Sequence, residues 1–237
     1  MTLGEYIFFP CDEGAGPTLT SSGDASVSLD LAAGTEAAAW ANSGYVTFDG
    51  TVYFRKLCSD LSTAAQNILG LDDSIIFSWA IINAASQSGA TALYRVGGGD
   101  TGQPGYEARI NANDYPAGRV RDESGVEDVS ASNSTSLNED YLVCWVFNNT
   151  ELVKQAYFYR KFNQSLGNVD LSNVGAAPLS TESNDYFSIG AGVFAGSAQL
   201  QIVGKVKNIG FMNLGSKMPA GIDDFVIQLN QNGGTLA

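Results

Sequence analysis

The amino-acid sequence predicts an all-β protein made of two packed antiparallel sheets with one or two short helices. Two observations predict this class. The 237 residues include 27 glycines and many Asn, Asp and Ser residues, which break the chain at short intervals. The segments between the breaks are rich in Val, Ile, Tyr, Phe and Trp, the residue types that strands favour. Sandwiches of this length commonly form one unit, so we predict a single domain over residues 1–237.

Two kinds of strand are expected. Segments 106–111 and 204–211 alternate apolar and polar residues, which predicts strands with one buried and one solvated face. Segments 75–82 and 142–147 are apolar almost throughout, which indicates central strands covered on both faces. In chain order the expected strands are 6–9, 45–48, 75–82, 91–96, 106–110, 119–121, 142–148, 155–160, 186–189 and 203–213.

Helix is expected in two places only. Segment 59–69 has apolar residues three and four apart, with Ser59 and Ser62 as candidate capping residues. Segment 219–229 places Pro219 at a helix start, acidic residues in the first turn, and an apolar stripe after them. We expect this second segment to be a terminal helix packed on the sandwich.

Charge and composition exclude several function classes. Lys and Arg number 12 against 25 Asp and Glu, a formal net charge of −13, so nucleic acid and anionic lipid would be repelled. The chain has no histidine, which excludes the Ser-His-Asp triad, the Cys-His dyad and histidine-ligated zinc or haem. No apolar run reaches the roughly 18 residues that span a bilayer, and no signal peptide is recognisable at the N-terminus. We expect synthesis in the cytoplasm, with neither nucleic-acid nor membrane partners.

The three cysteines, Cys11, Cys58 and Cys144, are an odd number without metal-ligand spacing. They suit neither a disulfide framework nor a zinc site. Cys is among the residue types that are most often buried, so all three are expected to be core residues.

Seven sequence pieces, in order, resemble laminin-G-like and concanavalin A-like lectin–glucanase domains. The N-terminal piece ends in Phe-Pro-Cys-Asp-Glu-Gly-Ala-Gly, similar to the family's F-D-E-G-x-G corner, and segment 46–54 contains its F-D-G-x-x-Y strand. The pieces lie at 6–16, 40, 46–54, 77–81, 142–147 with 156–159, 188–192 and 204–213. The resemblance covers most of the chain and implies a jelly-roll sandwich. The histidine usual near Tyr141 is absent, and the turn after Tyr159 differs from the family pattern.

Some relatives of this fold are glucanases whose strand carries Glu-x-Asp-x-Glu, because side chains two apart on a strand share a face. This sequence has no such triplet. The nearest acidic cluster, 122–128, is interpreted as a β-turn closed by Gly125 with solvated charges around it. The absence of the triplet disfavours a glycosidase or lyase. We therefore expect a protein without enzymatic activity.

Candidate ligand residues are few. An exposed aromatic ring that stacks on a sugar, beside Asn, Asp and glycine-loop backbone, would bind a glycan, and the best such cluster is Asp100, Tyr106, Asn113, Asp114 and Tyr115. Against it, Tyr106 is also interpreted as strand core and 114–116 as a turn.

No cofactor is predicted. Calcium is the alternative, since it takes oxygen ligands from loops. The weak candidates are Asp12 and Glu13, which are also interpreted as turn residues of the first corner.

Two functions remain. The resemblance extends to jelly rolls on bacteriophage virions, which implies a structural or adhesive surface module such as a capsid decoration, head-fibre or tail-fibre component. Its partners would be proteins of a symmetric assembly such as a capsid, including further copies of the chain. The alternative is a carbohydrate-binding lectin module, with or without calcium, that binds surface glycans.

Overall fold

The computed structural model describes most of the chain, including both sheets and all helices named below. The described residues are 2–70, 74–85, 87–98, 104–113, 116–122, 125–130, 138–148, 155–160, 164–170, 181–194 and 196–236. Side chains at 84, 121–122, 125–130, 148, 155–160, 164–170 and 194 lie outside the description.

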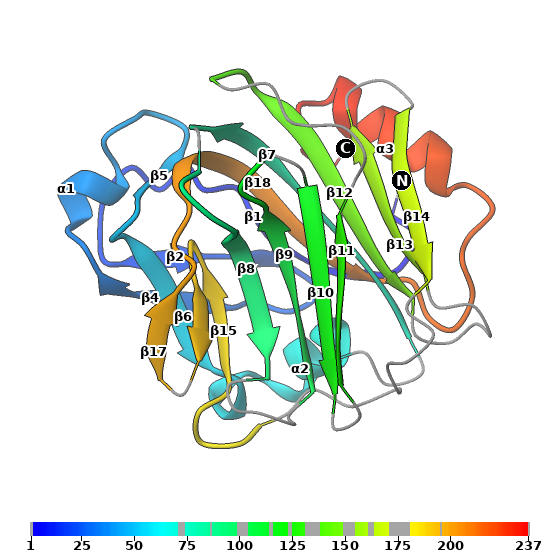
Figure 1. Ribbon diagram of the computed structural model, residues 1–237, viewed down its shortest axis with the longest axis horizontal. Coiled ribbons are helices and arrows are strands. Elements are labelled where there is room, and N and C mark those ends of the chain that lie inside the picture. The colour runs from blue at the N-terminus through cyan, green and yellow to red at the C-terminus, as the bar shows by residue number, and fades with distance from the viewer. Residues whose placement is uncertain are drawn as a thin grey trace.

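Two eight-stranded sheets face each other (Figure 1). The first, sheet A, runs β14 (Gln164–Asp170), β13 (Gln155–Arg160), β12 (Tyr141–Asn148), β7 (Ile75–Ala84), β18 (Val203–Asn213), β1 (Glu5–Phe9) and β3 (Ser22–Gly23), with β5 (Val46–Asp49) beside β18. The second, sheet B, runs β11 (Gly125–Ser130), β10 (Pro116–Asp122), β9 (Gly105–Ile110), β8 (Thr91–Gly97), β15 (Tyr186–Ile189), β6 (Tyr53–Leu57), β4 (Ser28–Ala33) and β2 (Thr18–Thr20). Every pairing between these strands is antiparallel, which confirms the predicted class.

The remaining elements in the described part of the chain are one hairpin and four short helical segments. They are β16 (Gly192–Phe194), β17 (Ser197–Gln199), α1 (Glu36–Ala39), the 3₁₀ turn Cys58–Asp60, α2 (Thr63–Leu69) and α3 (Ile222–Gln231). Both expected helices are confirmed, and the Ser62 side chain caps α2 by accepting from the Ala65 N–H. The terminal helix begins later than expected, so Pro219 lies before its first turn. None of the helices described is long and apolar enough to cross a membrane.

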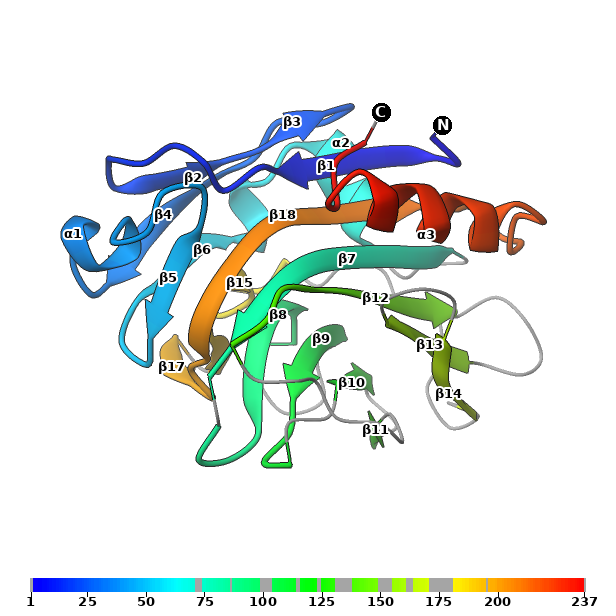
Figure 2. The same cartoon turned by 90° about the horizontal axis from the view of Figure 1, so that it is seen from above.

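Strand β7 is buried on both faces, as its apolar run predicts. Ile76 and Ile82 face sheet B in the main core, whereas Phe77 and Trp79 face the other way, toward Phe225 of α3. Figure 2 shows α3 alongside β18 and β7, on the side away from β9 and β10. The molecule therefore has three layers over these strands: α3, sheet A and sheet B.

Aromatic rings fill the space between the sheets. The Tyr94 ring lies 4.7 Å from Phe211 and 6.0 Å from Trp145, and Phe187 lies 5.2 Å from Phe211. The polar atoms of these rings are satisfied: Tyr94 and Ser78 share a hydrogen bond, and Trp145 Nε1 donates to the Ala117 carbonyl at 3.0 Å. Edge-to-face packing adds to the area that these rings bury.

All three cysteines are buried and carry free thiols, as the sequence predicts. Burial raises the pKa of the Cys58 thiol to about 12. Burial also raises the pKa values of the Cys11 and Cys144 thiols above the ordinary range. The three thiols therefore stay protonated at neutral pH and act as small core residues.

The Phe-Asp-Gly segment closes the turn after β5. The Asp49 carboxylate accepts hydrogen bonds from the Thr51 N–H at 2.8 Å, the Thr51 hydroxyl at 2.7 Å and the Val52 N–H at 3.1 Å. Gly50 has φ +87°, which glycine adopts without strain. The Asp-Gly pair is thus explained by the turn that it forms.

The Asp49 carboxylate in this turn makes the free energy of unfolding depend on pH. The hydrogen bonds from Thr51 hold the pKa of Asp49 below 3.8, its ordinary value. A depressed folded pKa contributes stability above the unfolded value, and this contribution is lost as pH falls through the folded pKa. We expect Asp49→Asn to lower the free energy of unfolding at about pH 7. The variant should then lose less stability than the wild type on acidification to about pH 3. Urea unfolding at both pH values tests this; equal losses in the two proteins would contradict it.

Candidate functional site

A row of mostly polar residues crosses sheet B from edge to edge. The printed registers align one residue from each strand: Thr18, Asp30, Arg55, Ser188, Arg95, Glu107, Arg119 and Asp128. Tyr94, Val96 and Tyr106, which alternate with members of the row, belong to the core between the sheets. Since neighbouring residues of a strand point to opposite faces, the row lies on the outer face of sheet B.

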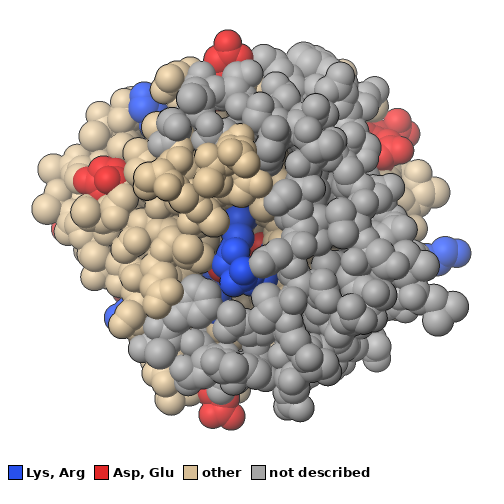
Figure 3. Space-filling view, in the orientation of Figure 1, with Lys and Arg blue, Asp and Glu red and all other residues tan. Residues whose placement is uncertain are grey.

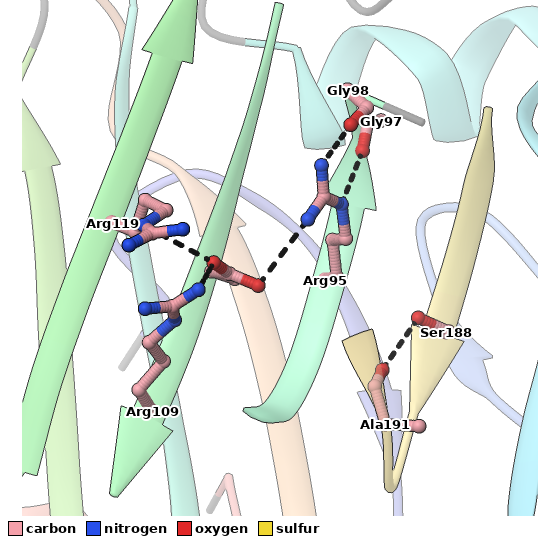
Figure 4. Close-up of polar contacts among 8 residues, drawn as sticks. Arg95, Gly97, Gly98, Arg109, Arg119, Ser188 and Ala191 are labelled. Atoms are coloured by element: carbon pink, nitrogen blue, oxygen red, sulfur yellow. Dashed lines mark hydrogen bonds and ion pairs between the residues drawn. The ribbon is translucent and has the colours of Figure 1, made fainter. Parts of the chain in front are cut away.

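The centre of the row is one carboxylate shared by three guanidinium groups (Figure 4). Glu107 Oε2 lies 3.5 Å from Arg95 Nη1, and Glu107 Oε1 lies 3.6 Å from Arg119 Nε. Arg109, two residues along β9 from Glu107, also pairs with Oε1. Strands β8, β9 and β10 each contribute at least one side chain, so the group exists only when these strands are paired.

The cluster is largely buried and rich in arginine. Glu107, Arg95 and Arg109 are 1%, 3% and 7% exposed, and the Arg119 side chain is 23% exposed. Arg95, Arg109 and Arg119 each pair with Glu107, and each takes part in further interactions. Buried charges are costly unless they are paired. An arginine cluster in a chain of net charge −13 is therefore a local feature that favours anions.

Figure 3 shows a hollow in the middle of this face, with Lys or Arg atoms at its floor and carboxylate atoms beside them. On β8, β9 and β10, the Lys and Arg side chains that the structure describes are those of Arg95, Arg109 and Arg119. Arg119, whose side chain is 23% exposed, is the member of the cluster that solvent reaches most.

Arg55 and Ser188, next to the centre of the row, contact other parts of the protein. Arg55 Nη1 donates to the Gly196 carbonyl at 2.7 Å, and its guanidinium lies 4.5 Å from the centre of the Tyr186 ring. Ser188 Oγ donates to the Ala191 carbonyl at 2.8 Å (Figure 4). The hairpin of β16 and β17 therefore contacts the row at Arg55.

Of the predicted glycan cluster, the structure describes Tyr106 and Asn113, and neither is among the residues of the arginine cluster. Tyr106 is buried between the sheets, where its ring packs against Tyr94 and Phe147 and its hydroxyl donates to the Leu69 carbonyl at 3.0 Å. Its ring faces are therefore not presented to a sugar, which corrects its place among the glycan candidates. Asn113 is exposed, and its N–H donates to Asn111 Oδ1 at 2.9 Å. Asp100, Asp114 and Tyr115 lie outside the described residues.

The metal candidates lie in the segment between β1 and β2. Asp12 and Glu13 are exposed, and Glu13 Oε1 accepts a hydrogen bond from the Thr20 N–H at 2.7 Å. In the described ranges no three Asp, Glu or Cys residues converge as a metal site would need. Calcium at Asp12 and Glu13 stays a prediction without further support.

Sequence reasoning missed the arginine cluster. Its signal is weak: an Arg or Glu interrupts each of three apolar strand segments, as in Tyr-Arg-Val, Tyr-Glu-Ala-Arg-Ile and Gly-Arg-Val. Alternation showed that these side chains share a face within a strand, but only the register places Arg95, Glu107 and Arg119 side by side.

Comparison with known proteins identifies the fold. No protein-family model matches the chain, and no curated protein sequence matches it. Among solved structures, the CBM40 carbohydrate-binding module of the Ruminococcus gnavus IT-sialidase is similar, with TM-score 0.55 and 12% identity, over 78% of this chain and 92% of that one. The same module bound to α2,3 sialyllactose gives TM-score 0.54 at 12% identity, over 78% of this chain and 91% of that one.

A sialidase contains a similar region. The Trypanosoma rangeli sialidase in complex with 2,3-difluorosialic acid matches with TM-score 0.64 and 15% identity, over 100% of this chain but 35% of that one. At these identities the similarity shows the fold alone, which is the concanavalin A-like jelly-roll sandwich expected from the sequence.

Proposed function

We propose that this chain is a carbohydrate-binding β-sandwich that binds an acidic glycan, one bearing a sialic-acid carboxylate, at the arginine cluster of sheet B. The observation that carries the proposal is the group of Arg95, Arg109 and Arg119 around Glu107 at the floor of a hollow. The similar structures are of proteins whose names include a CBM40 and sialidases. Their likeness adds weight to a glycan, in preference to other anions.

Arginine suits a carboxylate ligand for a geometric reason. The guanidinium is planar and presents its N–H groups in a fork that matches the two oxygens of a carboxylate. It also keeps its charge at any physiological pH. Arg119 has the greatest exposure of the three arginines, so the ligand carboxylate would meet it first, with Arg109 beside it.

Neutral sugars are not expected to bind this way. A neutral disaccharide offers the arginines no opposite charge, whereas a carboxylate does. The rest of the surface carries the negative charge of the chain, and it would repel acidic glycans from other faces. Binding should therefore require the acidic sugar and be weakened by salt.

Arg119→Gln is expected to weaken binding of α2,3-sialyllactose by about 10- to 100-fold, the cost of losing a hydrogen-bonded charge partner. Titration calorimetry measures it, with lactose as the neutral ligand. Arg55→Gln is the matched control, because Arg55 belongs to the same row but donates to Gly196 and lies over Tyr186. Equal weakening by both variants, or equal binding of lactose, would contradict the proposal.

The other expectations from sequence stay predictions. We propose a binding module without catalysis, because the chain lacks histidine and the paired-carboxylate strand motif. A place on a virion surface, in a symmetric assembly with partner proteins, is compatible with glycan binding. The similar structures named above do not concern virion proteins, so the carbohydrate-binding alternative is now the better supported of the two functions.

A further inference from the structure

We propose that Arg95 is a positioning residue of the arginine cluster: it holds Glu107 in place for Arg109 and Arg119 without contacting the ligand. The inference rests on the proposed function and adds a role within the same site. Arg95 lies in the middle of the row, between Ser188 and Glu107, and is more buried than Arg109 or Arg119.

The Arg95 guanidinium is bound on two sides by the protein. Its Nε donates to the Gly97 carbonyl at 3.0 Å, and its Nη2 donates to the Gly98 carbonyl. Its Nη1 faces Glu107 Oε2 at 3.5 Å (Figure 4). These contacts use all three nitrogens, so Arg95 joins the end of β8 to the central carboxylate.

The backbone around Arg95 is built for these contacts. Gly97 and Gly98 have φ values of +67° and +61°, a left-handed conformation that favours glycine. A Cβ on Gly105, which pairs with Gly97, would lie 2.6 Å from the Gly97 carbonyl carbon. Three glycines are therefore needed to turn the chain so that two successive carbonyls meet one guanidinium.

The effect of Arg95 passes through Glu107. One carboxylate serves three guanidinium groups, so its position sets how much of its charge each arginine meets. Without Arg95, Glu107 loses one of its three guanidinium partners and is expected to shift, and Arg109 and Arg119 would shift with it. Both arginines would then present a less favourable geometry to a ligand carboxylate.

A double-mutant cycle on the full chain tests this path. Affinity for α2,3-sialyllactose is measured for the wild type, Arg95→Gln, Glu107→Gln and the double variant. We expect Arg95→Gln to weaken binding roughly tenfold in the wild type and to have almost no effect in the Glu107→Gln background, as for coupled residues of one network. Gly98→Ala, which disturbs the same turn, should reproduce the weakening and should not add to that of Arg95→Gln.

Lysine at position 95 is the conservative control. Arg95→Lys keeps the charge but cannot reach two carbonyls and a carboxylate together. It should therefore weaken binding about as much as Arg95→Gln, whereas a purely electrostatic role would be rescued by lysine.

The outcomes separate this inference from the proposed function. Unchanged affinity in Arg95→Gln, or the same weakening with and without Glu107, overturns the positioning role, and the latter result would mean that Arg95 contacts the ligand. A wild type that binds no sialyllactose overturns the proposed function and, with it, the effect on affinity. In that case, unfolding free energies of the same four proteins still test the coupling of Arg95 with Glu107, and additivity would overturn it.

Discussion

Glu107→Ala is expected to lower the free energy of unfolding by about 3–5 kcal/mol, the usual cost of removing one partner from a buried ion pair. Glu107 is 1% exposed and is shared by Arg95, Arg109 and Arg119. Its removal leaves positive charges close together in a buried part of sheet B. Their mutual repulsion then opposes the pairing of β8, β9 and β10. Urea unfolding followed by tryptophan fluorescence measures the loss.

Two further variants serve as references for the loss of stability in Glu107→Ala. Glu13→Ala removes an exposed glutamate that accepts one hydrogen bond, so it should cost no more than about 1 kcal/mol. Glu107→Gln keeps an acceptor and most of the volume, so its cost should lie between those of the two alanine variants. If Glu107→Ala costs no more than Glu13→Ala, the cluster does not hold the strands together as described.

Trp79→Ala is expected to cost about 3–5 kcal/mol, as for large aromatic residues in a core. Trp79 is fully buried between sheet A and α3, 5.7 Å from the Phe77 ring and 6.2 Å from the Phe225 ring. Its indole covers Gly210, where a Cβ would lie 2.0 Å from the ring. Removing the ring would leave a cavity under α3 that its neighbours can fill only in part.

Trp79→Phe separates packing from hydrogen bonding. Trp79 Nε1 donates to the Gly234 carbonyl at 2.9 Å, which attaches the segment after α3 to sheet A. The phenylalanine variant loses this bond, worth about 1 kcal/mol, and part of the ring volume. Thermal unfolding should therefore rank wild type, Trp79→Phe and Trp79→Ala in that order. A loss of similar size in both variants would show that the hydrogen bond, and not the ring, is the main contribution.

Local patterns were sufficient for ten of the eighteen strands that the structure describes and for α2 and α3, but not for short elements such as β2, β4, β17 and α1. The apolar runs at 75–82 and 142–147 correspond to β7 and β12, which are buried on both faces. Phe-Asp-Gly marks the turn that Asp49 closes, and the apolar stripe after Pro219 marks α3. These features depend on residues close together in sequence, whose periods and turn preferences are local properties.

The site was not predictable in the same way. Alternation along 106–110 shows that Tyr106 and Glu107 point in opposite directions, but not which of them points inward. Placement of Tyr106 in the core and Glu107 on the outer face follows from the packing of sheet B on sheet A. A shift of one residue in register would move every side chain of a strand to the other face.

By itself, the sequence determined the all-β class, the positions of most strands and both main helices, the burial of the cysteines, and the exclusion of histidine chemistry. Only the tertiary structure decided that Arg95, Glu107 and Arg119, from three strands, form one charged group. It also decided that the hairpin of β16 and β17 occupies Arg55 and leaves the centre of the row at a hollow. The physical reason is that strand pairing and register join distant segments, whereas sequence patterns report the period of each segment alone.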